Sequence, residues 1–366
     1  MPEGPKPKPN LFHFATSELS QDAFLCWLAS WAAPEAAHSD PDLHKLGRDF
    51  LAALLEKRGH KLPETIIKVE LLRQYKKIDV LIKIDSHYTI CIEDKVGTTE
   101  HSDQLARYVE ALKSDGVPES RIIPIYVQTY EQLAYTSVKK AGYHLFDRQD
   151  LIELLRPYAE KKSNAIVRDF YDHLSKIDQE VNAFSSCRLH DWPWLAWQGF
   201  FRALREKLRQ GLPDASDAEW GYVPNRSGGF MGFWWSRLAG DGCHAYIQLE
   251  EEALCFKISV DDAARRRELR DRWMNRILQA ARDVDIVRPA RLGHGGTMTV
   301  ARFRSDYRAV DGRGILDMER TVGRLRDAMK VLGHAAGAAG WTLPSTGLLS
   351  VETIVSGSAS KRDLTH

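Results

Sequence analysis

Apolar residues recur at helical spacing and at strand spacing in turn along the first half of the chain. The pattern predicts helices at about 17–32, 42–58, 101–114, 148–160 and 164–184. It predicts strands at about 65–74, 77–84, 88–95, 121–128 and 143–146. A helix, a three-strand meander, a helix and a further strand follow one another in the order of an α/β domain whose mixed sheet is covered by helices.

The second half opens with an aromatic-rich helix at 192–211. After this helix, the second half is predicted to contain strands at about 220–223, 230–237, 244–249, 253–258 and 297–303. It is also predicted to contain helices at about 261–282 and 318–336. We therefore expect a smaller α+β domain here. The boundary is placed near residue 184, which gives a flexible Pro/Lys-rich tail over 1–10, a first domain over 11–184 and a second domain over 185–366.

Charged residues interrupt the hairpin predicted at 76–95, KKIDVLIKIDSHYTICIEDK. A turn centred on Ser86 places Asp79 opposite Glu93, with Lys95 two residues further along the same face. Leu81 and Cys91 pair on this face too, and the other face is apolar, pairing Val80 with Ile92, Ile82 with Ile90 and Ile84 with Tyr88.

Two carboxylates directly opposite each other destabilise a sheet. A divalent cation, which prefers hard oxygen ligands, would compensate for the charge of Asp79 and Glu93. The alternative is a solvent-exposed face on which these carboxylates and Lys95 form surface ion pairs. Helices predicted on both sides of the sheet argue against exposure.

Asp79, followed fourteen residues later by Glu93-Asp94-Lys95, resembles the signature of the PD-(D/E)XK nuclease superfamily. The resemblance implies a restriction-endonuclease-like αβββαβ core with a mixed sheet, and the predicted order of elements agrees with it. Ile78 stands where the signature has Pro, and many members lack that Pro. The resemblance covers about residues 10–130.

Two further stretches carry the resemblance. In DQLARY, Gln104 and Tyr108 lie four residues apart on one helix face and resemble the QxxxY motif of RecB-type members, where these residues position the Lys and the nucleic-acid backbone. The alternative is a polar helix surface. The segment SELSQDAFLCWLASWA is similar to the opening of an unassigned bacterial subfamily, in which Glu18 matches a family Glu and Gln21 replaces a family His. Glu18 is the preferred third carboxylate, and Asp22 is the alternative.

The resemblance implies that Glu18, Asp79, Glu93 and the Asp94 carbonyl hold Mg²⁺, or Mn²⁺ in its place. Such an ion lowers the pKa of a bound water and polarises the scissile phosphate. Lys95 would orient that water, either as a base or as an electrostatic clamp. Strand alternation sends the Asp94 side chain to the other face, so we do not expect it to bind the metal.

The basic residues change type between the halves. The net charge is +1 for the chain, −4 for residues 1–184 and +5 for residues 185–366, where 23 of 27 basic residues are Arg. Eight of the ten tryptophans also follow residue 190. Arg suits bidentate phosphate contacts and aromatic rings stack on unpaired bases, so this half is where substrate or partner choice is expected.

Three segments of the second half are candidates for binding. The arginines of the helix at 261–282 are interspersed with acids, which favours a salt-bridged face over a nucleic-acid surface; they are Arg265, Arg266, Arg267, Arg270 and Arg272. The stretch NRSGG at 225–229 is typical of a tight turn or an anion-binding loop, and equally of a hairpin with an aromatic core. The stretch RLGHGGTMT at 291–299 is a candidate loop, and its His294 has no metal-ligand spacing.

Five scattered cysteines without CxxC spacing favour a reducing cytoplasm. No apolar stretch approaches the ~18 residues that cross a membrane. The resemblance to the PD-(D/E)XK superfamily implies a divalent-metal-dependent nuclease acting on DNA, and by family analogy a setting in phage defence or DNA processing. The alternatives are a catalytically silent nucleic-acid-binding or regulatory module on the same fold, and a nucleotide phosphoesterase. A homodimer and a protein partner for residues 185–366 are left open.

Overall fold

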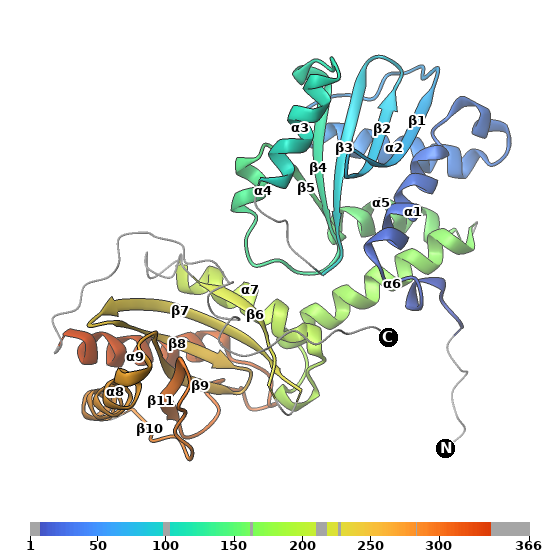
Figure 1. The fold of residues 1–366 in the computed structure, drawn as a ribbon. Coiled ribbons are helices and arrows are strands. Elements are labelled where there is room, and N and C mark those ends of the chain that lie inside the picture. The colour runs from blue at the N-terminus through green and yellow to red at the C-terminus, as the bar shows by residue number, and fades with distance from the viewer. Residues whose placement is uncertain are drawn as a thin grey trace, which may run out of the picture. The chain divides into compact units, whose positions relative to one another are not determined.

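The computed structural model describes residues 8–97, 103–161, 164–209, 218–225, 228–282 and 284–337. The chain divides into two compact units, Met1–Glu180 and Val181–His366, close to the predicted boundary at 184. Each unit has its own sheet (Figure 1). Most of the predicted tail over 1–10 lies outside the described residues. Within the described residues, no helix is both long and apolar enough to span a bilayer.

The first unit is built on a five-stranded mixed sheet in the order β1-β2-β3-β4-β5. The first three strands form an antiparallel meander, and β4 and β5 continue it in parallel. The strands are β1 (Val69–Tyr75), β2 (Ile78–Ile84), β3 (Tyr88–Lys95), β4 (Ile122–Gln128) and β5 (His144–Asp147). This is the restriction-endonuclease-like αβββαβ arrangement that the sequence predicted.

Helices cover both faces of this sheet (Figure 1). The larger core lies under α1 (Glu18–Ser30), α2 (Pro41–Glu56), α5 (Arg148–Glu160) and α6 (Ala165–Asn182). The smaller core lies under α3 (Gln104–Ser114) and α4 (Thr136–Lys140). Local sequence marks the helix starts, since Ser17 caps α1, Asp40 caps α2 ahead of Pro41, and Asp147 forms a capping box with Asp150 at α5.

The register predicted for the hairpin is confirmed. Val80 pairs with Ile92, Leu81 with Cys91, Ile82 with Ile90 and Ile84 with Tyr88. Val80, Ile82, Ile90 and Ile92 belong to the larger core, whereas Leu81 and Cys91 belong to the smaller one. Because both faces are covered, the charged residues at the end of β3 are not on an open solvent-facing surface.

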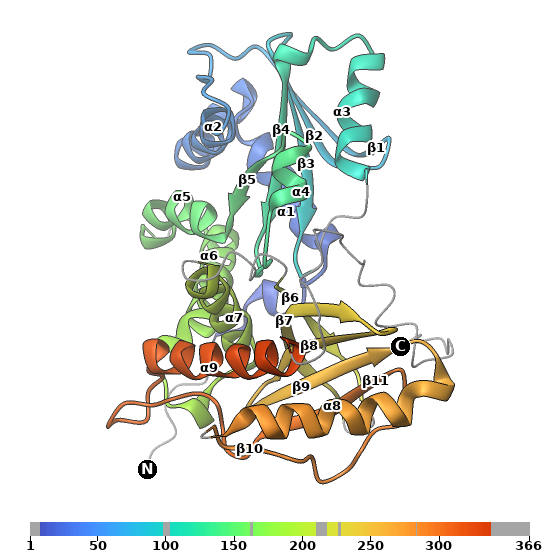
Figure 2. The same ribbon diagram turned by 90° about the vertical axis from the view of Figure 1, so that its left-hand side faces the viewer.

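The second unit was expected to be the smaller one. Its sheet nevertheless has six strands, against five in the first unit, in the order β10-β11-β9-β8-β7-β6. Its neighbouring strands are antiparallel throughout. The strands are β6 (Glu219–Val223), β7 (Phe230–Gly240), β8 (Cys243–Glu250), β9 (Ala253–Val260), β10 (Ile286–Val287) and β11 (Thr297–Phe303). Three helices pack against it, α7 (Trp194–Arg209), α8 (Arg266–Ala281) and α9 (Met318–Gly337), and α8 lies beside α9 (Figure 2).

Some elements differ from the sequence pattern. The first strand begins at Val69 rather than 65, because the Asp85 carboxylate accepts hydrogen bonds from the backbone N–H groups of Ile67 and Lys68. Strand β7 runs on to Gly240 through a register shift after Trp235. The short α4 and β10 were not predicted. Residues 101–102 and 210–211 of two predicted helices lie outside the described residues.

The tryptophans of the second unit mostly build its core instead of offering stacking surfaces. Trp197, Trp234, Trp235 and Trp273 are buried, while Trp194 is exposed. Large rings fill the space between a sheet and its helices. The sequence alone does not distinguish tryptophans that fill a core from tryptophans that stack on a ligand. In the 225–229 loop, Arg226 and Ser227 lie outside the described residues, and Tyr222 donates a hydrogen bond to the Gly228 carbonyl. At 291–299, Gly293 and His294 contact Arg270.

Candidate active site

Four elements bring polar side chains together at the carboxyl end of β3. Strand β2 supplies Asp79, and β3 supplies Glu93 and Lys95. Helix α1 supplies Glu18, and α3 supplies Gln104 and Tyr108. The following contacts connect all six of these predicted residues or their immediate neighbours.

Glu93 is the most buried member of the group, with none of its surface exposed. Its Oε1 lies 2.7 Å from Lys95 Nζ and accepts a hydrogen bond of 2.9 Å from Gln104 Nε2. Its Oε2 is buried and has no hydrogen-bond partner among the described residues. Burial, and then the nearby charge of Asp79, raise the pKa of Glu93 to about 7. One oxygen of this carboxylate is therefore satisfied and the other is left for a cation or a proton.

Lys95 lies between acceptors from two elements. Its Nζ contacts Glu93, donates to the Asp94 carbonyl at 3.2 Å and lies 3.6 Å from Glu18 Oε2. Burial by itself would lower the pKa of Lys95, but its hydrogen bond and ion pair with Glu93 outweigh it, so that the pKa is raised. The side chain is thus held as a charged ammonium beside the carboxylates.

Asp79 lies just beyond the paired part of the hairpin, which ends at Val80 and Ile92. Its Oδ2 accepts a hydrogen bond of 3.0 Å from the Asp94 backbone N–H, and its Oδ1 accepts one of 3.2 Å from Gln74. The side chain therefore bridges β2 and β3 at the position where the sequence placed it opposite Glu93.

The Asp94 side chain points to the other face of β3, as strand alternation predicted. There it accepts a hydrogen bond of 2.6 Å from Gln21 Nε2 of α1 and meets Asp22. Burial and then Asp22 raise the pKa of Asp94 well above its usual range, and burial and then Asp79 raise that of Asp22 to about 6. Asp22 Oδ1 and Asp94 Oδ2 are both buried, and neither has a hydrogen-bond partner among the described residues.

The two candidate helix carboxylates have different surroundings. Glu18 faces Lys95, at the charged end of β3, whereas Asp22 faces Asp94 on the covered side. This geometry is consistent with the preference for Glu18, whose role in metal binding stays a prediction.

Gln104 and Tyr108 form a connected pair on α3. Gln104 Nε2 lies 2.6 Å from the Tyr108 hydroxyl and 2.9 Å from Glu93 Oε1, and the Tyr108 ring is buried in the smaller core. The amide therefore couples the helix to the buried carboxylate, which a polar helix surface would not do.

Sequence reasoning missed two residues, Gln21 and Gln128, that hold the end of β3 in place through hydrogen bonds. Gln21 was noted only as the residue replacing a His, yet it holds Asp94. Gln128, at the end of β4 and paired with Lys95, donates to the Val96 carbonyl at 3.1 Å. A single polar residue at the end of an apolar strand was the only signal for Gln128.

The donor atoms fit a divalent cation at one side of the site. The Asp79 and Glu93 carboxylates and the Asp94 carbonyl are hard oxygen ligands, and the buried Glu93 Oε2 lacks a donor. Over the part of the chain that the structure describes, no three His, Cys, Asp or Glu side chains come close enough together to hold a metal ion. The fit therefore rests on two carboxylates.

Comparison with known proteins agrees with this geometry. A family model described as the PD-(D/E)XK nuclease superfamily matches residues 43–190. The matched range holds Asp79, Glu93, Lys95, Gln104 and Tyr108, and it begins after Glu18. No curated protein and no solved structure matches the chain.

Proposed function

Because a family model of the PD-(D/E)XK nuclease superfamily matches residues 43–190, we propose that the protein is a divalent-metal-dependent nuclease that hydrolyses phosphodiester bonds in DNA. One observation carries the proposal. The buried Glu93 shares one oxygen with Lys95 and Gln104, leaves the other without a donor, and lies beside Asp79. A buried carboxylate with a perturbed pKa next to a second acid is typical of a catalytic site.

Asp79, Glu93, the Asp94 carbonyl and Glu18 would hold Mg²⁺, with Mn²⁺ as a substitute. When bound, the ion supplies a water of lowered pKa and polarises the scissile phosphate. This metal assignment is consistent with the hard oxygen donors at the end of β3.

Lys95 would act as an electrostatic clamp. Its ammonium already lies among three acceptors, so it is positioned to orient the attacking water and to neutralise charge that develops on the phosphate. Gln104 donates to Glu93 and thereby fixes the carboxylate that fixes Lys95, and Tyr108 fixes the amide in turn.

The experiment is cleavage of plasmid, single-stranded DNA, RNA and free nucleotides with Mg²⁺, Mn²⁺ or EDTA. We expect cleavage of DNA with either metal and none with EDTA. We expect Lys95→Ala to lower kcat by at least about 10²-fold, as for loss of one preorganised charge donor. Lys140→Ala, which removes an exposed lysine of α4, is the matched control and should cleave normally.

Full cleavage by Lys95→Ala, or cleavage that persists in EDTA, would overturn the proposal. Circular dichroism of both variants separates loss of chemistry from loss of fold. Cleavage of nucleotides alone would assign a phosphoesterase.

A second function is favoured by one observation. Within the described residues no triple acidic or His/Cys cluster is preformed, which suits a catalytically silent nucleic-acid-binding or regulatory module on the same fold. Tight DNA binding without metal-dependent cleavage of any substrate in the assay above would select this module. A setting in phage defence or DNA processing, and a role of the second unit in targeting, sensing or assembly, belong to the nuclease proposal by analogy of fold alone.

A further inference from the structure

The second unit contains a cavity of about 580 Å³ between α8 and α9. Arg276 and Arg282 line it from the α8 side, and Lys330 and His334 line it from α9. Asp327 is the one acid among its described lining residues. Its floor is apolar and includes Val284, Val331 and Ala335. A cavity with a basic rim and an apolar floor selects an anionic ligand that also presents a non-polar surface.

Three of the arginines nearer the start of α8 are paired with acids, as the salt-bridged interpretation of this helix predicted, whereas Arg266 donates to backbone carbonyls and Arg267 is exposed. Arg265 and Arg272 both bind Asp241, and Arg272 also binds Glu268. Arg270 binds Asp271 and the Gly293 carbonyl. The arginines that line the cavity, Arg276 and Arg282, lie at the other end of the helix.

The cations of the cavity are held in ways that leave them able to bind. The Arg276 guanidinium lies 5.8 Å from the centre of the Trp273 ring, within the range of a cation–π contact, which does not require its N–H donors. Lys330 pairs with Asp327 at 2.9 Å, but both side chains are largely exposed, and such surface pairs contribute little free energy. A phosphate group that replaced the Asp327 carboxylate as the partner of Lys330 would therefore break this ion pair at little cost in free energy.

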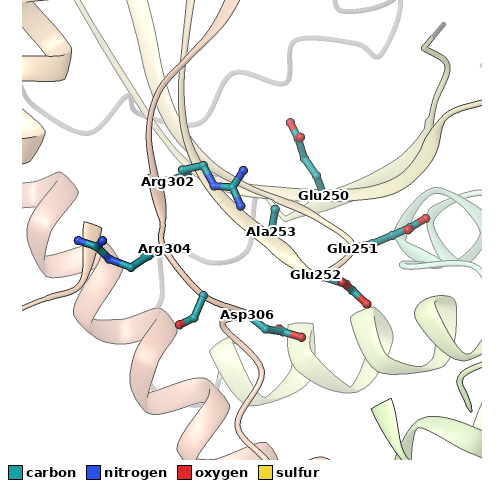
Figure 3. A pocket seen from close by; sticks show the side chains of 8 residues that line it. Glu250, Glu251, Glu252, Ala253, Arg302, Arg304 and Asp306 are labelled. Atoms are coloured by element: carbon teal, nitrogen blue, oxygen red, sulfur yellow. The ribbon is translucent and has the colours of Figure 1, made fainter. Parts of the chain in front are cut away.

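A second cavity in this unit, of about 330 Å³ near the turn between β8 and β9, has the opposite character (Figure 3). Four of its eight lining residues are acids, against two arginines, Arg302 and Arg304. Its charges are mostly engaged with neighbours: Glu250 with Lys257, Glu252 and Asp306 with Arg308, and Arg304 with Asp285. It offers no excess of positive charge to a phosphate.

We propose that the cavity between α8 and α9 binds phosphate groups of a nucleic-acid backbone, as a contact separate from the carboxylate site of the first unit. Arg276 and Arg282 supply planar donors that match phosphate oxygens, and Lys330 supplies a point charge. The apolar floor accommodates the sugar between successive phosphates. The inference rests on the proposed function for its choice of nucleic acid as the ligand.

The test is binding of labelled single-stranded DNA to the full chain carrying Lys95→Ala, in EDTA, over a range of salt concentrations. Arg276→Gln together with Lys330→Gln is expected to weaken binding and to lower the slope of log Kd against log salt by about 1.4, since each single-strand phosphate contact contributes ~0.7. Asp327→Asn, which removes the acid that competes with phosphate, is expected to tighten binding.

The matched control is Arg267→Gln together with Arg326→Gln. These arginines lie on the same two helices, are exposed and do not line the cavity, so the change in net charge is the same. Equal effects of the two double variants, or no effect of either cavity substitution, would overturn the inference. Binding of poly-glutamate that depends on Arg276 and Lys330 while DNA binding does not would also overturn it, in favour of an acidic protein partner.

Thermal melting shows whether the cavity variants fold, and Asp327→Asn tests the same contact with a change of opposite sign. Because binding is measured without metal and without the catalytic lysine, it is independent of cleavage. Cleavage by the native chain with unaltered binding by the cavity variants defeats this inference alone. Altered binding without any cleavage by the native chain defeats the nuclease proposal alone.

Discussion

Glu93 is the residue on which the electrostatics of the first unit converge. A fully buried carboxylate is costly unless it is paired and hydrogen-bonded, and here only Oε1 has partners among the described residues. Asp79 adds repulsion, which together with burial raises the pKa of Glu93 to about 7. Such a carboxylate lowers the stability of the fold but is well suited to holding a cation. A bound cation would offset both the burial of the charge and the repulsion by Asp79.

At this scale we predict graded effects along the hydrogen-bonded chain from α3. Gln104→Ala removes the donor to Glu93 Oε1 and is expected to lower kcat by about 10- to 100-fold, the range for residues that orient a metal ligand. Tyr108→Phe keeps the ring in the core and removes only the hydroxyl that contacts Gln104, so its effect should be smaller. Steady-state kinetics at saturating metal and substrate measure both.

Gln104→Glu serves as the comparison, because it keeps the length of the side chain but replaces the donor with a second acid. A smaller loss in Gln104→Glu than in Gln104→Ala would contradict the role of the amide as donor. An effect of Tyr108→Phe as large as that of Gln104→Ala would mean that Tyr108 acts on its own.

At the scale of elements, α1 is attached to β3 by polar contacts as well as by the core. Gln21 and Asp22 both meet Asp94 on the covered face, and Glu18 reaches Lys95 at the end of the strand. Asp94 in turn donates its backbone N–H to Asp79 and accepts from Lys95 with its carbonyl. The position of α1 therefore affects the backbone between Glu93 and Lys95 of β3.

Gly47 allows α2 to approach α1 closely. A Cβ at this position would lie 2.6 Å from Ala32 N and 2.8 Å from Trp31 C, so that Gly47→Ala must push the helices apart. We predict a loss of about 1–3 kcal/mol in the free energy of unfolding, as for other overpacked sites. Because α1 carries Glu18 and Gln21, cleavage should fall as well. Urea unfolding and the cleavage assay measure the two effects.

Gly333→Ala is the matched control. Gly333 lies within α9 and nothing is within 4 Å of its would-be Cβ, so the same substitution should raise the free energy of unfolding by about 0.5–1 kcal/mol. Equal stability of Gly47→Ala and the native chain would show that α1 and α2 can separate without cost, and would remove the argument that their spacing positions the site.

The elements and contacts that could be predicted from the sequence are those fixed by local pattern. The period of two in the hairpin and its short turn set the register that joins Val80 to Ile92, and with it the position of Asp79. The contact of Asp94 with Gln21 joins residues 73 positions apart, and no local pattern encodes it. The five-residue α4 and two-residue β10 are too short to show a period. Whether a tryptophan is buried likewise depends on tertiary contacts, which no local pattern encodes.

At the scale of the whole molecule, acids and bases are distributed unequally between the two units. The first half has a net charge of −4 and contains the carboxylate site, and the second has +5 and contains the basic cavity. A net charge near zero for the chain as a whole hides both features. The division suits a protein in which one unit holds a cation and the other contacts an anion, as the two proposals describe.

This division predicts a selective response to metal. Each unit has its own sheet and buried core, so the two should unfold in separate transitions, resolvable by scanning calorimetry. An ion that binds only the folded first unit stabilises it by about 2.7 kcal/mol at 100 times its Kd. For a domain of this size each kcal/mol corresponds to about 2–4 °C. Mg²⁺ should therefore raise one transition temperature by several degrees and leave the other unchanged.

Two variants assign the shifted transition to the carboxylate site. Asp79→Asn removes one ligand charge and should abolish the shift, whereas Asp327→Asn, which neutralises an acid in the second unit, should leave it intact. A shift of both transitions in every variant would indicate general screening of charge instead of a site. No shift at any metal concentration would select the silent module, because a nuclease of this kind needs the ion.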